Sequence, residues 1–259
     1  MKIFINADSF KDIALKTKDD LIRYCEELDI EIAKDISEAD ILFSIGGDGT
    51  FLNTAKMTDR PIIGINTGTL GYLTEVKPDD LQKALKSILS DNYTVENRMM
   101  VEGKIIKSDG DEITIPESLN EIAISKNVNG VVRFDAIVNS KLITSYIADG
   151  ILVCTPTGST AYNLSCGGPI VDPTAEILTI TPIAPHTVLN KSIVLSKNSI
   201  IKIKITELRD NTSAYVLNDG IPNKLESGDI VEIKKSDKIT KIIKLEDRSF
   251  IDTVRENLS

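Results

Sequence analysis

The residues best suited to chemistry in this chain form the run Gly46-Gly47-Asp48-Gly49-Thr50. The apolar residues 41–45 before the run are typical of a strand, and residues 51–55 after it suit a helix. Glycines let the backbone approach a bound group, and a helix N-terminus favours an anion such as phosphate. Asp48 is the one reactive side chain of this loop, which suits a general base or a magnesium ligand. The alternative is a tight turn in which Asp48 only caps the helix.

A second candidate site is the hydroxyl-rich segment, residues 155–165, which follows another strand-like run. It contains short hydroxyl side chains, a glycine and one aromatic ring: Thr155, Thr157, Gly158, Ser159, Thr160, Tyr162 and Ser165. Hydroxyls donate and accept hydrogen bonds without charge, and a tyrosine can cover an apolar ring, so the set suits a nucleoside. The alternative is a turn whose Ser and Thr side chains satisfy their own backbone. A serine nucleophile is not indicated, because neither a Ser-x-x-Lys nor a Gly-x-Ser-x-Gly context surrounds these serines.

Two polar residues, Asn120 and Glu121, begin the β-like run at 119–124. The amide of Asn120 carries a donor and an acceptor and could read an adenine edge or a ribose, and Glu121 could accept from ribose hydroxyls. The alternative is that both are turn residues that face solvent. The single histidine, His186, lies between Pro185 and Thr187 and fits a structural role better than that of a base.

Composition limits the classes of function. The chain has 259 residues and a net charge of −9, so a general nucleic-acid or anionic-membrane surface is excluded and any phosphate site is local. No apolar run approaches the roughly 20 residues that span a bilayer, and we predict a cytoplasmic protein. Three cysteines, Cys25, Cys154 and Cys166, lack metal-ligand spacing and are expected to be reduced and structural.

The first 90 residues alternate strand and helix patterns. Strands are expected at 2–6, 30–33, 41–45 and 61–65, and helices around 21–28, after residue 48, and from Pro78 on with Leu81, Leu85, Ile88 and Leu89 on one face. Continuous apolar strands separated by helices predict a Rossmann-like parallel α/β sheet covered on both faces. Ligands bind such sheets at the carboxyl ends of the strands, where Asp48 and the loop at 66–72 would both lie.

From about residue 93, strand-like runs follow one another. Turn dipeptides separate them at 109–110, 129–130, 139–140, 219–220 and 228–229. Residues 201–205 alternate with period two, as in a strand with one buried face. The pattern predicts a β-sandwich-like C-terminal domain. We therefore expect an α/β domain at 1–95 and a β-rich domain at 96–245, and the segment at about 246–259 could pack on the first domain as a short helix.

Taken together, these motifs resemble those of the NAD kinase family. The matching elements occur in order: Gly46-Gly47-Asp48-Gly49-Thr50, Asn66-x-Gly-x-Leu-Gly71, Asn120-Glu121, Asp149-Gly150, Thr155-Pro-Thr-Gly-Ser-Thr-Ala-Tyr162, Gly167-Gly168-Pro169 and Pro182-x-x-Pro-His186. Gly-Gly-Asp-Gly alone also resembles lipid kinases and phosphofructokinases. The block that ends at Tyr162, together with Asn120-Glu121, is the specific part.

The resemblance implies a two-domain kinase that transfers a phosphoryl group from ATP or polyphosphate, with Mg²⁺ on the donor, to the 2′-hydroxyl of the adenosine ribose of NAD. It implies that Asp48 is the base and that Gly46, Gly47 and Gly49 shape the phosphate loop. The remaining implied contacts are Tyr72 beside the substrate, Asn120 and Glu121 on the adenosine half, Ser159, Thr160, Ala161, Tyr162 and Ser165 around adenine, and Asp149 and Ala184 near nicotinamide. The last two often lie across a subunit contact in the family, which implies a homodimer or homotetramer.

The chain departs from the family pattern at Ile147, where many members have an arginine two residues before the aspartate that matches Asp149. Cys154 and Cys166 stand where serine or alanine is common, which we expect to change packing only. Two rival functions are a lipid kinase, which would need an apolar entry for acyl chains, and a dinucleotide sensor without catalysis. Asp48 argues against the sensor, because binding alone gains nothing from a carboxylate that faces phosphates.

Overall fold

The computed structural model describes residues 1–68, 71–127, 129–209, 212–218, 221–245 and 249–258. They form two compact units, one of residues 1–98 with 239–259 and the other of residues 99–238. The predicted divisions were at 95/96 and 245/246. Both observed divisions fall within long strands, β5 (Thr94–Ile106) and β16 (Ile230–Lys244), which contribute residues to both units.

The first unit is built on a parallel sheet with the strand order β2-β1-β3-β4-β16. Its elements are β1 (Lys2–Ala7), α1 (Asp12–Glu27), β2 (Glu31–Ile32), β3 (Ile41–Gly46), α2 (Asp48–Met57), β4 (Ile62–Asn66), α3 (Leu81–Leu89) and α5 (Phe250–Leu258). Every residue of β3 and of β4 is buried, as the continuous apolar runs predict. The predicted α/β architecture is confirmed.

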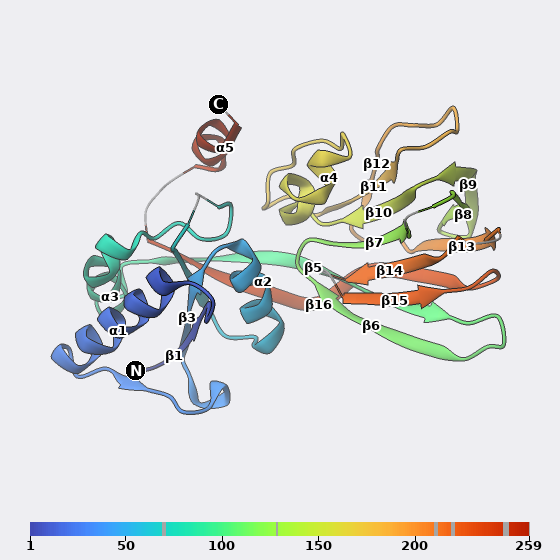
Figure 1. Cartoon of the computed structure of the whole chain (residues 1–259). Coiled ribbons are helices and arrows are strands. Elements are labelled where there is room, and N and C mark those ends of the chain that lie inside the picture. Colours follow the sequence, from blue (N-terminus) through green and yellow to red (C-terminus); the bar gives the residue numbers. More distant parts are fainter. Residues whose placement is uncertain (69–70, 128, 210–211, 219–220, 246–248, 259) are drawn as a thin grey trace. The chain divides into compact units, whose positions relative to one another are not determined.

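Helices cover both faces of this sheet. Figure 1 shows α1 and α3 on one side of β1 and β3, and α2 on the other. Leu21 and Cys25 of α1 and Leu81, Leu85 and Ile88 of α3 pack in one core with the sheet. Leu89, which we predicted on the same face of α3, is 45% exposed, because it lies about 100° around the helix from Ile88 at the last turn.

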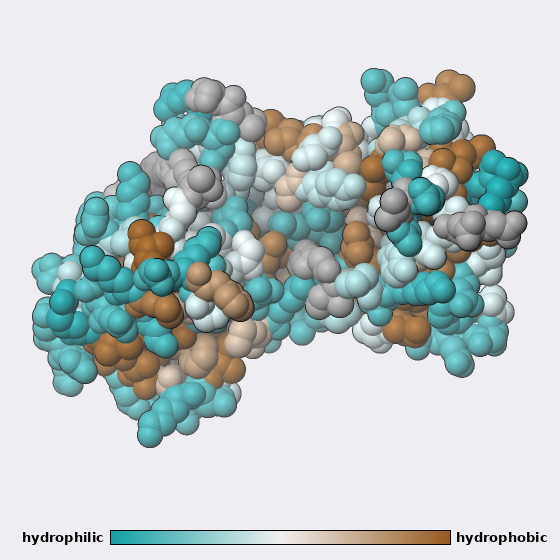
Figure 2. All heavy atoms as spheres, in the orientation of Figure 1, coloured by the Kyte–Doolittle hydropathy of each residue, from teal (hydrophilic) through white to brown (hydrophobic). Residues whose placement is uncertain are grey.

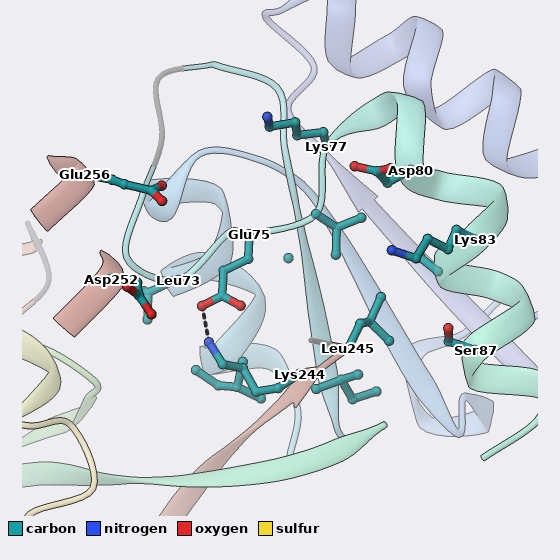
Figure 3. A pocket seen from close by; sticks show the side chains of 15 residues that line it. Leu73, Glu75, Lys77, Asp80, Lys83, Ser87, Lys244, Leu245, Asp252 and Glu256 are labelled. Atoms are coloured by element: carbon teal, nitrogen blue, oxygen red, sulfur yellow. Dashed lines mark hydrogen bonds and ion pairs between the residues drawn. The ribbon is translucent and has the colours of Figure 1, made fainter. Parts of the chain in front are cut away.

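The end of β16, α3 and α5 line a cavity of about 610 Å³ within the first unit. Figure 3 shows Glu75 paired with Lys244 beside this cavity, and the amino group of Lys83 pointing into it from α3. Both members of the pair are largely buried. Glu75 follows β4 and Lys244 ends β16, so the pair links the N-terminal and C-terminal segments that together form the first unit.

The second unit is an antiparallel sandwich, as predicted. One sheet has the order β12-β11-β10-β7-β14-β15, and the other contains β5, β6, β16, β13, β8 and β9. Its further elements are β6 (Glu112–Ser118), β7 (Glu121–Lys126), β8 (Val132–Val138), β9 (Lys141–Ala148), β10 (Gly150–Cys154), α4 (Tyr162–Ser165), β11 (Ile177–Ile183), β12 (Ile193–Ser196), β13 (Ile201–Glu207), β14 (Ala214–Asn218) and β15 (Ile221–Leu225). The predicted turn at 219–220 lies outside the described residues.

The two faces of the six-stranded sheet have different partners. One face packs in the core of the sandwich through residues such as Ile124, Val153 and Ile180. The other face carries a small apolar cluster of Ala123, Leu152, Cys154 and Ile183, with Cys166 packed against it. The hydroxyl-rich segment with α4 follows β10 (Figure 1), and this second face is where the candidate residues of the unit gather. No helix among the described residues is long and apolar enough to cross a bilayer.

Candidate functional site

The phosphate loop, residues 46–50, lies at the carboxyl edge of the parallel sheet. β3 ends at Gly46, and α2 begins at Asp48 with Gly47 as its N-cap. A Cβ atom on Gly46 would overlap the Thr50 side chain, so the turn requires glycine there. The alternative that Asp48 caps α2 is wrong, because Gly47 holds the cap position and the Asp48 carboxylate makes its hydrogen bonds with another loop.

The Asp48 carboxylate is held by the chain that follows β4. Its Oδ2 accepts from the backbone N–H of Tyr72 (2.8 Å), and its Oδ1 accepts from those of Leu73 (3.1 Å) and Thr74 (3.3 Å). The Thr74 hydroxyl also donates to Oδ1 at 3.3 Å. Each carboxylate oxygen has two lone pairs, so Oδ1 is fully used. Among the described residues, Oδ2 accepts only from Tyr72, which leaves it the capacity for one more proton donor.

Gly71 is the residue that lets this arrangement form. A Cβ atom at Gly71 would overlap the Asp48 carboxylate, whereas a Cβ at Gly68 of the same loop would meet only Lys11 Nζ, at 3.9 Å. We expect Gly71→Ala to displace the carboxylate from its hydrogen bonds and to lower the rate of the phosphoryl transfer that the resemblance implies about ten-fold or more, with some loss of thermal stability. Gly68→Ala is the matched control and should stay close to the parent. Equal rates for the two variants in a steady-state assay would show that the position of Asp48 does not matter.

Tyr72 and Asn66 lie in the same region, as the sequence predicted for the edge of the sheet. Asn66 donates to the carbonyl of Thr74 and accepts from the N–H of Gly68, which fixes the loop at both ends. The Tyr72 hydroxyl is buried and has no hydrogen-bond partner in the part of the chain that the structure describes. Burial raises the pKa of Tyr72, and the charge of Asp48 adds to the effect, so the phenol stays protonated.

In the second unit, the structure brings Asn120 and Glu121 against the hydroxyl-rich segment. Glu121 pairs with Cys154 across β7 and β10, so the start of one strand adjoins the end of the other. Thr155 donates through its N–H to the carbonyl of Asn120 (2.9 Å) and through its hydroxyl to that of Leu119 (2.6 Å). Asn120 lies in the bend before β7, and Glu121 is the first residue of that strand. Both are only partly exposed, so neither is a turn residue whose side chain faces solvent completely.

Part of the hydroxyl-rich segment serves its own fold. Ser159 is fully buried, and its hydroxyl bonds to the backbone of Val171. Asn163, which the sequence analysis did not single out, is also fully buried and donates to the carbonyls of Ser159 (3.2 Å) and Pro169 (3.1 Å). The alternative of a self-satisfying turn therefore describes Thr155 and Ser159, and a ligand contact of Ser159 stays a prediction.

Four residues of the hydroxyl-rich segment have side chains that a ligand could reach. Thr160 and Ala161 are partly exposed, and Tyr162 and Ser165 are exposed. Burial raises the pKa of Tyr162, and Cys166, Asp149 and Glu121 add to it in that order. The Tyr162 hydroxyl therefore lies within electrostatic reach of both carboxylates.

Asp149 and Ala184 lie at the other end of β10. The Asp149 N–H donates to the carbonyl of Ile183 (3.0 Å), and its carboxylate pairs with Lys126 Nζ at 2.8 Å. Ala184 has a φ of 44°, a left-handed conformation that is strained for a residue with a Cβ atom. Sequence reasoning missed Lys126, because nothing in its neighbours shows that β7 and β10 place it beside Asp149.

The loop after Ala184 docks on β9. The backbone N–H of His186 donates to the carbonyl of Ile147 at 2.8 Å, and the hydroxyl of Thr187 accepts from the N–H of Ile147 at 3.2 Å. The His186 side chain is exposed. Ile147 therefore holds the loop after Ala184 through its backbone N–H and carbonyl. The positive charge beside Asp149 comes from Lys126.

The three cysteines are unpaired thiols, as expected. Burial raises the pKa of Cys25 to about 11 and that of Cys154 to about 12, and it also raises the pKa of Cys166. Since the thiolate is the reactive form, we expect Cys25 and Cys154 to resist a thiol reagent at pH 8 until the protein unfolds.

The same thiols predict a loss of stability in alkali. Above about pH 9 a thiol ionises in the unfolded chain but not in the fold, so the free energy of unfolding should fall by about 1.4 kcal/mol per pH unit for each of Cys25 and Cys154. The loss for Cys25 should end near pH 11, its folded pKa. Urea titrations at pH 8 and 10 measure the slope. Rapid labelling of all three thiols in the native protein would contradict the expectation.

The comparisons with known proteins cover most of the chain. Residues 7–93 match the model of the ATP-NAD kinase N-terminal domain, and residues 119–245 match that of the ATP-NAD kinase C-terminal domain. The NAD kinase of Caldanaerobacter subterraneus subsp. tengcongensis is 41% identical over 228 residues, which are 86% of this chain and 80% of that protein. The chain belongs to the NAD kinase family. The NAD kinase of Ruminiclostridium cellulolyticum is 35% identical over 90% of this chain and 82% of its own length.

Solved structures of NAD and NADH kinases share the fold. Yeast NADH kinase, solved in complex with NADH, has a TM-score of 0.89 at 24% identity and covers 100% of this chain and 87% of its own. An NAD kinase from Archaeoglobus fulgidus, solved in complex with ATP, has a TM-score of 0.79 at 27% identity and covers 98% of both chains. The family resemblance inferred from the motifs is confirmed.

Proposed function

We propose that this chain transfers a phosphoryl group from ATP to the 2′-hydroxyl of the adenosine ribose of NAD, giving NADP. The observation that carries the proposal is the Asp48 carboxylate, which four donors from residues 72–74 hold at the edge of the sheet beside the phosphate loop. A relative with the same two domains was solved with ATP bound, and the relatives that match over most of the chain are NAD kinases.

Asp48 would act through Oδ2, the oxygen that keeps a lone pair for an incoming hydroxyl. In phosphoryl transfer the protein mainly holds the attacking oxygen and the donor phosphate in line and neutralises charge. A carboxylate that accepts the hydroxyl proton raises the electron density of the attacking oxygen as the new O–P bond forms. The amides of residues 72–74 then fix where the proton goes, because they leave the carboxylate little freedom to turn.

The donor phosphates would lie on the phosphate loop, at the N-terminus of α2. Gly47 and Gly49 line a cavity of about 490 Å³ at the carboxyl ends of β1 and β3, and a Cβ atom at either would meet nothing within 4 Å. Mg²⁺ would arrive with the donor. Hydrogen-bond donors from residues 72–74 already hold the Asp48 carboxylate, so the donor phosphates would carry the ion.

The second unit would bind NAD. Asn120 and Glu121 offer an amide and a carboxylate to the adenosine, Tyr162 offers an exposed ring, and Thr160, Ala161 and Ser165 offer small side chains around it. Asp149 and Ala184, at the other end of β10, would meet the nicotinamide half. Free thiols support a reducing, cytoplasmic location.

An assay with an NADP-specific dehydrogenase tests the proposal. The purified chain is incubated with NAD, Mg²⁺ and either ATP or polyphosphate, and NADP is measured by the coupled reaction. We expect NADP to form with ATP. A sensor would bind NAD and make no NADP, and a lipid kinase would phosphorylate a lipid but not NAD, so either result would overturn the proposal.

A homo-oligomer is also expected. Asp149 and Ala184 match positions that reach a neighbouring subunit in the resembled family, and a closed dimer or tetramer would bring a second copy to that end of β10. Light scattering of the purified chain should give a mass of two or four copies of the 28.4 kDa chain. An active monomer at assay concentrations would remove this expectation.

A further inference from the structure

The cavity beside the phosphate loop has an apolar side that phosphoryl chemistry does not require. Phe10 and Met57 line it together with Gly47, Gly49 and Lys11. Phe10 is 96% exposed and Met57 is 50% exposed. A single exposed apolar side chain is ordinary, but exposed apolar groups that lie together at a cavity mark binding surfaces.

The backbone that carries Phe10 is well held. The N–H of Asp8 donates to the carbonyl of Ile45 at 2.9 Å, which extends the pairing of β1 with β3 beyond the strand. The Asp8 carboxylate then accepts from the N–H of Phe10 at 3.0 Å. Figure 2 shows apolar side chains at the surface over the region of α1, the helix that follows this turn. The ring of Phe10 is therefore presented to solvent by an ordered turn.

The same turn brings a cation to the cavity. Lys11 is half exposed, and its Nζ lies 3.7 Å from the Asp8 carboxylate, too far for a close hydrogen-bonded pair. The ammonium group can therefore turn to a phosphate. The cavity thus combines free backbone at Gly47 and Gly49, a lysine, and an aromatic face. This combination matches the phosphates and the base of a nucleotide, and its volume of about 490 Å³ suits one such ligand.

We propose that Phe10 stacks on the base of a nucleoside triphosphate, so that the phosphoryl donor is a nucleotide and not inorganic polyphosphate. Met57 covers the same base from α2, and Lys11 pairs with the phosphate chain. An inorganic polyphosphate has no aromatic face and gains nothing from Phe10. The inference rests on the proposed function, because it assigns the donor of the same reaction.

Calorimetry can test this without turnover. Mg²⁺-ATP and Mg²⁺-tripolyphosphate are titrated into the parent, Phe10→Ser, Phe10→Tyr and Ile13→Ser. Ile13 is the matched control, because it lies three residues after Phe10 in the first turn of α1, is 50% exposed and does not line the cavity. Base stacking of this kind predicts that Phe10→Ser weakens ATP binding about 5- to 100-fold and leaves tripolyphosphate binding within about two-fold. Phe10→Tyr and Ile13→Ser should match the parent.

The outcomes separate this inference from the proposed function. Unchanged ATP affinity in Phe10→Ser, or an equal loss of ATP and tripolyphosphate affinity, would overturn the role of Phe10. A parent protein that binds tripolyphosphate as tightly as ATP would overturn it as well. If Phe10 controls ATP binding but the chain forms no NADP in the coupled assay, the nucleotide site stands and the kinase assignment fails.

Discussion

Asp48→Asn should lower the turnover of NAD by about 10²–10⁴ while NAD affinity changes little. The substitution keeps the size of the side chain but removes the proton acceptor. It also places an amide NH₂ where one carboxylate oxygen now accepts from the N–H groups of residues 72–74, so the hold on the side chain weakens too. Steady-state rates at saturating Mg²⁺-ATP and NAD measure the first effect, and calorimetry with NAD measures the second.

Two comparisons decide what such a loss means. Gly71→Ala moves the carboxylate without removing it, so it should fall between the parent and Asp48→Asn. A metal-ligand role for Asp48 would instead raise the Mg²⁺ concentration needed for half activity and leave the maximal rate nearly unchanged. If Asp48→Asn turns over NAD within a few-fold of the parent at saturating substrates, Asp48 is not the base.

Gly158→Ala should weaken NAD binding roughly 100-fold. A Cβ atom at Gly158 would overlap the carbonyl oxygen of Asn120, and backbone cannot move aside as a side chain can. Overpacking of this kind costs about 1–3 kcal/mol of stability. Displacing Asn120 and its neighbours would remove two or more ligand hydrogen bonds, and the loss of about 2.7 kcal/mol would weaken NAD binding roughly 100-fold.

Asn120→Ala is the comparison for this variant. It deletes one side chain without moving the backbone, so its NAD affinity should fall only about ten-fold and its melting temperature should stay near that of the parent. Thermal melts and calorimetry on both variants give the two numbers. A Gly158→Ala protein with parental NAD affinity would show that the hydroxyl-rich segment does not position Asn120 for the substrate.

The sequence predicted the sheet of the first unit well, because its strands are buried on both faces and read as continuous apolar runs. It could not predict how β5 and β16 serve both units. A strand that continues from one core into another has no break in its pattern, so the predicted divisions fell outside these strands or near one end. Leu89 shows the same limit on a smaller scale, since an apolar residue at a helix end satisfies the pattern whether or not a partner covers it.

Candidate site residues can be proposed from the sequence where reactive or polar side chains stand in a short motif. Asp48 and Tyr162 share their motifs with glycines, and Asn120 stands beside Glu121 at the start of a strand-like run. Gly71, Gly158 and Lys126 matter through contacts between segments distant in sequence, with Asp48, Asn120 and Asp149 respectively. Their roles depend on which loops the sheets place together, and that information is not local to any motif.

In the proposed reaction, a phosphoryl group moves from ATP to the 2′-oxygen of NAD at Asp48. The most direct measurement is ³¹P NMR of NAD incubated with Mg²⁺-ATP and the purified chain, with Asp48→Asn run in parallel. We predict one new phosphomonoester on the adenosine 2′-oxygen with the parent, and about 10²–10⁴ times less of it per unit time with the variant. A phosphate on another ribose oxygen, release of inorganic phosphate alone, or equal product from both proteins would contradict the account.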